Sequence, residues 1–361
     1  MKIIHVLQGM QKASGVSSFV GGLTSGLCDL GTDVAIAADF VDDAIQYPID
    51  TRIKFWELSL INSDLISEYD VVHIHGLWTW NLHTISHLCY KNKTPVMWST
   101  HGSLAPWAMK SKRWKKMPAW YMWQKRDLLK TKMFHATSTC EEQWIRKLGF
   151  VQPCVVAPLG TVVKFGRKPC ASTHKTLLFV GRVYPVKALD RLISAFSMIP
   201  VFVRKNWRLR VVGPDQGNHM KTLKALSSRL KVESYVEFVG SRYDNDLDLE
   251  YASCDCLALV SHSENFGSTV VEALAHGKPC ITSVYTPWRE LPDRGCGWWV
   301  DNMPEKLSET LKEMMSLSDA ERRNMGANGR KLVEEKYTWT KIAEQIKNAY
   351  DEIVMGKNLG A

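Results

Sequence analysis

The segment CLALVSHSENFGSTVVEALAHGKP, residues 256–279, carries much of the information about the fold of this chain. It opens with the apolar run Cys256–Val260, passes through a polar loop that contains Gly267, and continues into an apolar run with helical spacing. A short buried strand, a glycine-bearing turn and a helix, in that order, are typical of one unit of a parallel α/β sheet. We therefore expect ligand-binding groups in the loop that follows the strand.

Two carboxylates flank the start of the expected helix. Glu264 lies in the loop, Glu272 follows eight residues later, and Ser268 or Thr269 is expected to begin the helix. The free N–H groups and the dipole of a helix start favour an anion, and Glu272 would lie about 6 Å further along the helix axis. Carboxylates accept hydrogen bonds from paired sugar hydroxyls but repel bare phosphate. The layout predicts a ligand with phosphate in its middle and sugar at both ends, which is the shape of a nucleotide-sugar.

The rest of the chain repeats the alternation of short β-branched runs with longer amphipathic runs, which predicts parallel sheets. In the first half, the expected strands are Ile3–Leu7, Val34–Ala38, Val71–His75, Val96–Thr100, Phe134–Thr137 and Val155–Ala157. In the second half, they are Thr176–Val180, Leu209–Val212, Val236–Val239, Cys256–Val260, Pro279–Thr282 and Trp298–Val300. A chain of 361 residues is too long for one typical core. We predict two doubly wound α/β domains that face each other across a cleft.

The domain bounds follow from the weakly periodic basic segment between the two series of strands. We expect a first domain over residues 1–160, a linker over 161–174 and a second domain over 175–340. Residues 341–361 are expected to form a C-terminal helix that packs back on the first domain.

Composition points to a cytoplasmic protein with an anionic partner. The chain is 45% hydrophobic and 23% charged, and its net charge is +9. It has no apolar run of the roughly 18 residues that span a bilayer, and its start lacks the pattern of a secretion signal. Its nine cysteines form no doubled CxxC pattern, and Cys254 and Cys256 are expected to be buried thiols. The positive charge favours a phosphorylated small molecule, an anionic membrane or nucleic acid as partner.

Further candidate groups follow two other strands. Arg182 and Lys187 come directly after a strand and before a helix, where an arginine fork and a lysine point charge suit a diphosphate. Gly15 follows the first strand and opens a helix, where backbone N–H groups are able to approach a phosphate. The spacing there is not G-x-G-x-x-G, so a plain tight turn at Gly15 remains the alternative.

In combination, these motifs resemble the retaining glycosyltransferases of family 4. The resemblance lies in E-x7-E after a strand, in G-R-x4-K upstream of it and in H-G-K-P downstream, and it covers nearly the whole chain. It implies the GT-B fold of two facing Rossmann-like domains and a nucleotide-sugar donor, UDP-sugar favoured over GDP-sugar, with no cofactor and no metal. The chain departs from the family pattern in three places. Ala188 stands where glycine is common, and the segment APLGT, residues 157–161, lacks the usual asparagine before its glycine. Trp288 and Arg289 are unusual neighbours of Glu290.

The resemblance also implies roles for individual residues. Arg182 and Lys187 would hold the donor diphosphate, and Glu272 would bind the ribose hydroxyls. Glu264 and the backbone of Asn265, Phe266 and Gly267 would hold the donor sugar, and Ser268 and Thr269 would cap the phosphates. His101, which follows the strand VMWST, matches a family histidine at the reacting centre. With no general base among the motifs, the implied mechanism is front-face attack with retention, in which the departing phosphate accepts the acceptor's proton.

A basic aromatic segment between His101 and Phe134 is the candidate acceptor side. Its tryptophans alternate with cations, among them Trp107, Trp114, Lys115, Lys116 and Trp120. This mixture suits an anionic membrane interface, and the alternative is a solvated basic helix whose tryptophans pack on the core. The expected acceptor is a glycan or a lipid-linked glycan, as in lipopolysaccharide, capsule or exopolysaccharide assembly at the inner face of the membrane.

Other interpretations stay open at this point. A nucleotide-sugar epimerase or a phosphorylase-like enzyme would use a similar fold, and a non-catalytic module would use the basic face on a membrane or on RNA. We expect no nucleic-acid partner, because no RNA-binding motif is present. His73 and His75 share one strand face, but no third ligand has recognisable spacing, so we predict no metal site.

Overall fold

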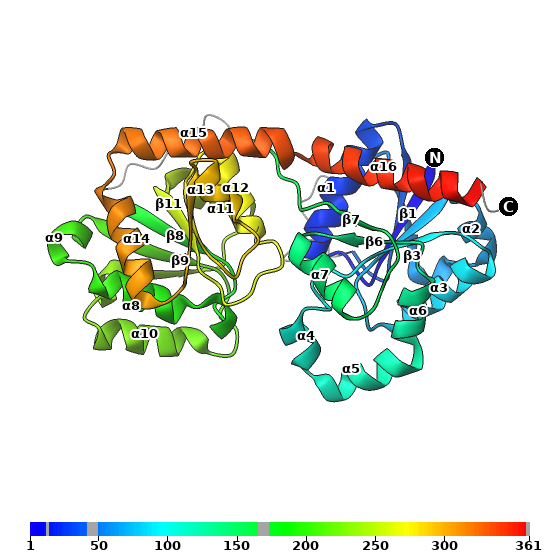
Figure 1. Ribbon diagram of the computed structural model, residues 1–361, viewed down its shortest axis with the longest axis horizontal. Helices are drawn as coiled ribbons and strands as arrows, with labels where there is room; N and C mark the ends of the chain where they lie inside the picture. The colour runs from blue at the N-terminus through cyan, green and yellow to red at the C-terminus, as the bar shows by residue number, and fades with distance from the viewer. Residues whose placement is uncertain (12–13, 42–49, 165–172, 359–361) are drawn as a thin grey trace. The chain divides into compact units, whose positions relative to one another are not determined.

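The computed structural model describes residues 1–11, 14–41, 50–164 and 173–358 (Figure 1). The chain divides into two compact units, and each unit has its own sheet. Unit 1 consists of residues 1–160 and 339–361, and unit 2 of residues 161–338. Of the expected linker, residues 161–164 belong to unit 2, and residues 165–172 lie outside the described residues.

Unit 1 is built on a parallel sheet whose described strands run in the order β3-β2-β1-β4-β5-β6-β7. The strands are β1 Lys2–Leu7, β2 Asp33–Ala38, β3 Lys54–Glu57, β4 Val71–His75, β5 Val96–Ser99, β6 Met133–Ala136 and β7 Cys154–Val156. The chain starts in the middle, winds to one edge and then winds to the other, which confirms the predicted doubly wound fold. The edge strand β3 was not predicted, because its sequence KFWE is largely exposed and carries no apolar alternation.

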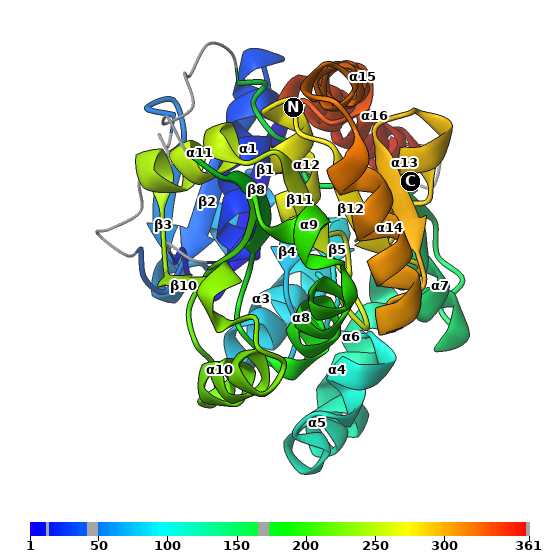
Figure 2. The ribbon, with the colours of Figure 1, turned by 90° about the vertical axis from the view of Figure 1, so that its left-hand side faces the viewer.

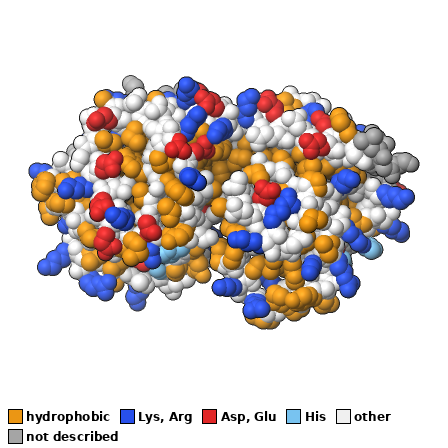
Figure 3. All heavy atoms as spheres, viewed as in Figure 1, with side chains coloured by type: hydrophobic (Ala, Val, Ile, Leu, Met, Phe, Trp, Pro, Cys, Tyr) orange, Lys and Arg blue, Asp and Glu red, His pale blue; other side chains and the backbone are white. Residues whose placement is uncertain are grey.

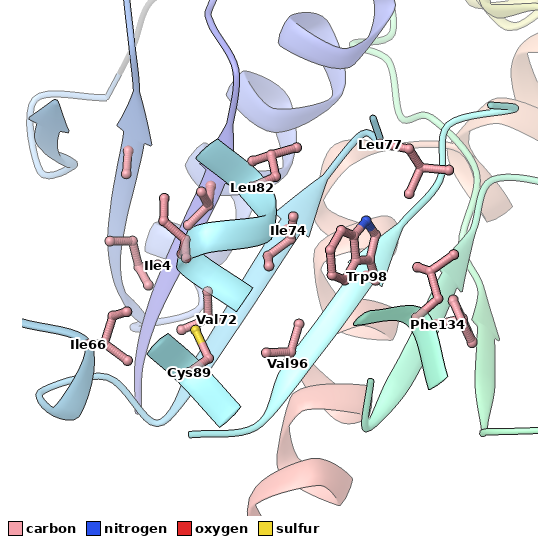
Figure 4. Packing of buried hydrophobic residues seen from close by; sticks show 14 of the residues in the cluster. Ile4, Ile66, Val72, Ile74, Leu77, Leu82, Cys89, Val96, Trp98 and Phe134 are labelled. Atoms are coloured by element: carbon pink, nitrogen blue, oxygen red, sulfur yellow. The ribbon is translucent and has the colours of Figure 1, made fainter. Parts of the chain in front are cut away.

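Helices cover both faces of this sheet. They are α1 Gly15–Asp29, α2 Ser63–Ser67, α3 Trp80–Lys91, α4 Pro106–Lys110, α5 Arg113–Ala119, α6 Lys125–Lys130, α7 Thr139–Lys147 and α16 Trp339–Asn358. On one face, Ile4, Ile74 and Trp98 pack with Leu82 and Cys89 of α3 in a fully apolar core (Figure 4). The opposite face lies under α1 and α16 and has a second core. Because successive strand residues alternate between faces, these central strands are buried on both sides.

The C-terminal helix α16 completes unit 1 by packing on α1 (Figure 1). A Cβ atom at Gly22 would lie only 2.0 Å from the ring of Trp339, and one at Gly26 would lie 2.9 Å from the Cβ of Ala343. Glycines on α1 therefore permit the close approach of α16, whose side chains reach the strands of the sheet below.

Unit 2 repeats the architecture, and its described strands run in the order β10-β9-β8-β11-β12-β13. The strands are β8 Lys175–Val180, β9 Trp207–Val212, β10 Val236–Gly240, β11 Cys256–Leu259, β12 Cys280–Ser283 and β13 Gly297–Val300. The helices are α8 Leu189–Met198, α9 Val201–Arg204, α10 His219–Arg229, α11 Asp244–Ser253, α12 Ser268–Ala275, α13 Glu290–Asp293, α14 Pro304–Ser316 and α15 Asp319–Lys336. Helices α8 and α14 pack side by side (Figures 1 and 2). All six predicted strands of this half are confirmed, with bounds shifted by two residues or fewer.

The strand order places the loops after β8 and β11 next to each other. These two strands are parallel neighbours although their starts, Lys175 and Cys256, lie 81 positions apart in the chain. Ligands of doubly wound sheets bind where the strand order reverses, beyond the carboxyl ends of the strands. In unit 2 that point lies between β8 and β11. No helix among the described residues combines the length and the apolar composition that crossing a bilayer requires.

Candidate functional site

An ion pair joins the two loops at the reversal point of unit 2. The Nζ atom of Lys187 lies 2.6 Å from Oε2 of Glu264, and each side chain is only 15% exposed. The hydroxyl of Ser261 donates to the same carboxylate oxygen at 3.1 Å. Two residues that the sequence assigned to diphosphate and sugar therefore share one polar cluster.

Backbone geometry holds Lys187 in place. The residue ends a single helical turn, Pro185–Lys187, and the N–H of His262 donates to the carbonyl of Val186 at 2.8 Å, which ties the two loops together. Ala188 follows in the left-handed conformation with φ of +52° and is fully buried. This position favours glycine, which accounts for the glycine that is common in the family pattern.

Arg182 follows β8 on the exposed side of the same loop. Its guanidinium donates to the side-chain carbonyl of Gln216 at 2.9 Å, and Gln216 belongs to the loop after β9. The structure thus adds Gln216 as a positioning partner that the sequence did not reveal.

Gly267 forms the turn that directs the N-terminus of helix α12 toward this cluster. Its φ of +82° is left-handed, and a Cβ atom would lie 2.8 Å from Cδ2 of Leu259. The preceding Phe266 is buried against Trp288, whose indole N–H donates to the Phe266 carbonyl at 2.6 Å. Trp288, noted in the sequence only as an unusual neighbour, therefore supports the loop from behind.

The first turn of α12 presents hydroxyls and backbone groups beside the ion pair. Ser268 and Thr269 are its first two residues, and Asn265 lies in the loop before it. The Oγ1 atom of Thr269 is buried, and among the described residues it has no hydrogen-bond partner. A hydroxyl in this position at a helix start is suited to a phosphate oxygen.

Glu272 lies one turn further along α12. The hydroxyl of Tyr251, from α11, donates to Oε2 of Glu272 at 2.5 Å. Burial raises the pKa of the Glu272 carboxyl, while hydrogen bonds from Tyr251 and Ser268 oppose that rise. Tyr251 is a further residue that the sequence did not single out.

Two predicted residues of unit 1 lie at the carboxyl edge of its sheet. Gly15 is the first residue of α1, and Ser14 caps the helix by accepting from the N–H of Ser17. A Cβ atom at Gly15 would meet nothing within 4 Å, so no close packing of the protein explains the glycine. His101 follows β5 with a left-handed φ of +47°, and its Nε2 lies 3.0 Å from Nδ1 of His75.

A buried carboxylate supports the His101 turn. Glu141 is fully buried near the start of α7 and accepts hydrogen bonds from Thr100, Gly102 and Thr137. Burial alone would raise the pKa of Glu141, but the nearby His101 and these hydrogen bonds hold it below its ordinary value. Burial also lowers the pKa of His101 to about 4, although the charge of Glu141 acts in the opposite direction.

The pair His73 and His75 gains a third histidine that the spacing did not show. His5, on the adjacent strand β1, is paired in register with His73, and one nitrogen from each of the three rings lies within 4.8 Å of the others. The ring nitrogens of this group lie within hydrogen-bonding distance of one another or of Tyr350, Ser99 and His101. The prediction that the protein needs no metal is untested.

The basic aromatic segment forms α4, α5, a π-helical turn over Trp120–Gln124 and α6. Trp107 is 46% exposed and Trp114 is 75% exposed, and Figure 3 shows hydrophobic and basic side chains gathered over this region. The ammonium of Lys115 lies 4.8 Å from the ring of Trp114. Lys116 is half-buried and donates to the carbonyl of Ala108 at 2.7 Å.

Trp120 corrects one expectation about this segment. The sequence grouped it with the exposed tryptophans, but it is buried, and its ring packs on Trp78 and Phe150. The helical period turns Trp120 inward, so it stabilises the core rather than a docking surface.

Unit 2 also has a hollow of about 640 Å³ at the other edge of its sheet. Its lining includes Lys175, the first residue of β8, and Asp255 and Lys278, which precede β11 and β12. Lys175 is paired with Asp319 at 2.9 Å. This hollow lies away from the loops after β8 and β11 and contributes none of the predicted site residues.

Comparisons with known proteins agree with the geometry. Residues 13–164 match the family model described as Glycosyltransferase Family 4, and residues 164–332 match the model described as Glycosyl transferases group 1. An N-acetyl-alpha-D-glucosaminyl L-malate synthase of Bacillus anthracis is 28% identical over 185 residues, 51% of this chain and 47% of that protein. The lipopolysaccharide glucosyltransferase WaaG of Escherichia coli K12 is 31% identical over 145 residues, 39% of this chain and 37% of that protein. The chain thus matches about half the length of these curated relatives or less.

Solved structures agree on the fold. Anabaena Alr3699/HepE in complex with UDP and glucose superposes with a TM-score of 0.77 at 16% identity, covering 98% of this chain and 100% of that one. The structure of WaaG, a glycosyltransferase involved in lipopolysaccharide biosynthesis, gives a TM-score of 0.70 at 18% identity, with 97% and 99% covered.

Proposed function

Because this chain belongs to the glycosyltransferases of the family 4 type and has the GT-B fold, we propose that it moves a sugar from a nucleotide-diphosphate donor to an acceptor hydroxyl. The observation that carries the proposal is the 2.6 Å pair of Lys187 and Glu264 beside the start of α12. It brings a cation for phosphate and a carboxylate for sugar hydroxyls to one point of the sheet. A plain structural ion pair would not need the glycine turn and the helix start aimed at it.

The donor is proposed to lie along this cluster in unit 2. Arg182 and Lys187 bind the diphosphate, and the N–H groups and hydroxyls at the start of α12 bind the same anion. Glu272, one turn along the helix, accepts from the ribose hydroxyls, and Glu264 accepts from the transferred sugar. UDP is the favoured carrier, which is supported by the UDP complex described for HepE.

The proposed reaction retains the anomeric configuration and uses no metal. The transition state is oxocarbenium-like, as in other glycosyl transfer, and negative charge develops on the leaving diphosphate. Arg182, Lys187 and the dipole of α12 stabilise that charge. The rest of the rate enhancement comes from orientation, because the acceptor hydroxyl is held on the front face of the sugar. The leaving phosphate takes the hydroxyl proton.

The acceptor is proposed to be a glycan carried at an anionic membrane, as in lipopolysaccharide, capsule or exopolysaccharide assembly. The support comes from exposed Trp107 and Trp114 among lysines on α4 and α5. Indole rings favour the interfacial region, and each lysine adds about 1 kcal/mol near anionic lipid. Sedimentation with anionic vesicles tests this step, and the double variant Trp107→Ala/Trp114→Ala should lose binding. Phe202→Ala is the matched control, since Phe202 is 74% exposed on α9 of unit 2; equal binding by both variants would remove the membrane from the proposal.

A binding and turnover series tests the donor. Calorimetric titration with UDP, GDP, ADP and CMP, with and without EDTA, should show one preferred nucleotide and no effect of EDTA. Incubation with UDP-sugars should then release UDP, and NMR of the product should show the donor's anomeric configuration. Binding of no nucleotide, or a strict need for a divalent ion, would contradict the proposal.

A further inference from the structure

A hollow of about 470 Å³ lies at the edge of the unit 1 sheet where β5 and β6 begin. Its lining includes Tyr90, Pro95, Val96, Lys93, Lys130 and Lys132, and we name it the lysine hollow. Gly15 and His101 follow β1 and β5 and therefore belong to the opposite edge of the sheet. The lysine hollow thus contains none of the residues that the sequence assigned to a site.

Contacts between α3, α6 and β5 hold the walls of the lysine hollow in place. Helices α3 and α6 pack against each other (Figure 1), and the Tyr90 hydroxyl donates to the carbonyl of Asp127 in α6 at 2.7 Å. The N–H of Lys132 donates to the carbonyl of Val96 at 2.9 Å, which joins the turn after α6 to β5. The ammonium of Lys130 lies 5.5 Å from the centre of the Tyr90 ring. The two segments that carry the lysines therefore lie side by side.

The lysine hollow concentrates positive charge without a carboxylate. Its lining includes three lysines and no aspartate or glutamate. The two segments that supply the lining, residues 80–96 and 128–140, contain no acidic residue. Asp127, the acidic residue of α6, is paired with His83 at 2.8 Å. Within the part of the chain that the structure describes, none of the three lysines forms an ion pair.

The ends of two helices give the lysines a partial structural role. Helices α3 and α6 end at Lys91 and Lys130, and the C-terminus of a helix carries roughly half a negative charge. The two ends together balance about one of the three ammonium charges, so roughly two positive charges remain. Lys91, in the last turn of α3, already places one further cation at the end of that helix. The helix ends therefore do not account for the charge of the lysine hollow.

Two hollows of unit 2 are also lined by cations, but cations there have acidic partners. In the hollow of about 640 Å³, Lys175 is paired with Asp319 at 2.9 Å. In another hollow, of about 700 Å³, Arg210 is paired with Glu250 at 2.6 Å and with Glu237 at 2.7 Å. These pairs bind one segment of unit 2 to another. The lysine hollow differs because its three cations are exposed and have no such pairs among the described residues.

We propose that the lysine hollow binds a phosphate-bearing ligand. Ammonium groups supply point charges and donors for phosphate oxygens, and a phosphate group carries about two negative charges near neutral pH. Pro95, Val96 and the Tyr90 ring form apolar lining that suits the organic part of such a ligand. The volume also lies within the range of small-molecule sites, about 300–1,000 Å³.

This site is independent of the proposed function, because it uses no residue of the proposed donor site. The same phosphate chemistry is presented by a soluble phosphorylated molecule and by the head group of an anionic lipid. The experiments below first test the site and then distinguish these two sources.

The first experiment is a titration with inorganic pyrophosphate, followed by NMR of the full chain labelled with ¹³C-lysine. The signals of Lys93, Lys130 and Lys132 are assigned by single Lys→Arg variants. We expect the three signals to shift together, with one dissociation constant. No shift of these signals, or a shift no larger than that of the exposed lysines Lys221 and Lys231 of unit 2, would overturn the proposal.

A matched pair of variants measures the contribution of one lysine. In Lys93→Gln, the signals of Lys130 and Lys132 should report pyrophosphate binding that is about fivefold weaker. Lys231→Gln is the control, because Lys231 follows α10 as Lys93 follows α3, with φ of +56° against +57°. Both variants remove one exposed charge at the same backbone position. Equal binding by the two variants would overturn the proposal, because the effect would then be one of net charge.

Vesicle flotation distinguishes the two sources of phosphate. It is measured with phosphatidylcholine vesicles, with and without phosphatidic acid, on Trp107→Ala/Trp114→Ala, so that the exposed tryptophans of α4 and α5 do not contribute. If Lys93→Gln in this background weakens flotation with phosphatidic acid and Lys231→Gln does not, the ligand is a lipid head group. Equal flotation of the two, with pyrophosphate still shifting the lysine signals, assigns a soluble phosphorylated molecule. Lysine signals that do not respond to pyrophosphate overturn the proposal whatever the vesicles show.

Discussion

Lys187 and Glu264 lie 77 positions apart in the chain, and their side chains meet at 2.6 Å where the sheet of unit 2 reverses its strand order. The pair couples the group proposed to bind phosphate to the group proposed to bind sugar. A bound donor would have to share both, so that the sugar and the diphosphate are fixed relative to each other at the bond that breaks.

The ion pair should be measurable as a coupling energy. Lys187→Met and Glu264→Gln each leave one mostly buried charge without its partner, whereas the double variant leaves neither charge. We expect the double variant to be more stable than the sum of the single effects predicts, by about 1–3 kcal/mol. Urea unfolding of the four proteins measures this coupling. A coupling energy of zero would mean that the two groups do not interact in solution.

Arg182→Ala should weaken nucleotide binding without loss of stability. The side chain is exposed and bonded only to Gln216 among the described residues, so the unfolding free energy should change by no more than about 0.5 kcal/mol. Loss of a charge-assisted hydrogen bond costs about 1.5–3 kcal/mol, which is roughly 10- to 150-fold in the dissociation constant for UDP. Calorimetry measures it. Arg229→Ala is the control, because Arg229 is an exposed arginine at the end of α10; a matching loss there would indicate a general charge effect.

Nucleotide affinity should fall at low pH through Glu272. Burial raises the pKa of this carboxyl, so it takes up a proton at a pH where an ordinary glutamate is still ionised. Because the ionised carboxylate is the better acceptor for ribose hydroxyls, UDP should bind more tightly above this pKa and more weakly below it.

Two variants distinguish the protonation of Glu272 from the protonation of UDP itself. Glu272→Gln should bind UDP more weakly and lose this part of the pH dependence. Tyr251→Phe removes a hydrogen bond that lowers the pKa of Glu272, so the fall in affinity should move to higher pH. Isothermal titration between about pH 5 and pH 8 gives the three profiles, and identical profiles would assign the pH dependence to the ligand alone.

The sequence predicted the sheets well because their signal is local. Twelve β-branched runs coincide with strands of the structure, and the loops that follow β8 and β11 carry the residues expected there. The edge strand β3 was not predicted, because its residues are largely exposed. The contact between Lys187 and Glu264 could not be derived from spacing, since it depends on β8 lying beside β11.

The hydrogen-bonded cluster of buried histidines in unit 1 was missed for the same reason. His73 and His75 were recognised on one strand face, but His5 and His135 lie alone in apolar runs far away in the sequence, and only the strand order makes them neighbours. Each of the four is a polar residue at an inward position of a buried strand. That pattern was visible in the sequence, whereas Tyr350 on the last helix gave no signal at all.

Two glycines with left-handed backbones should respond very differently to alanine. Gly213 has φ of +144°, and a Cβ atom there would lie 1.9 Å from the carbonyl oxygen of Gly181, next to Arg182. Gly217 has φ of +71° and nothing within 4 Å of its Cβ position. Gly217→Ala should therefore cost only the conformational penalty, about 1–2 kcal/mol, whereas Gly213→Ala must also separate the ends of β8 and β9 and should cost more than about 4 kcal/mol. Hydrogen exchange of the β8 and β9 amides reports the stability of unit 2 alone, and equal loss of protection in the two variants would mean that the loops after β8 and β9 tolerate displacement.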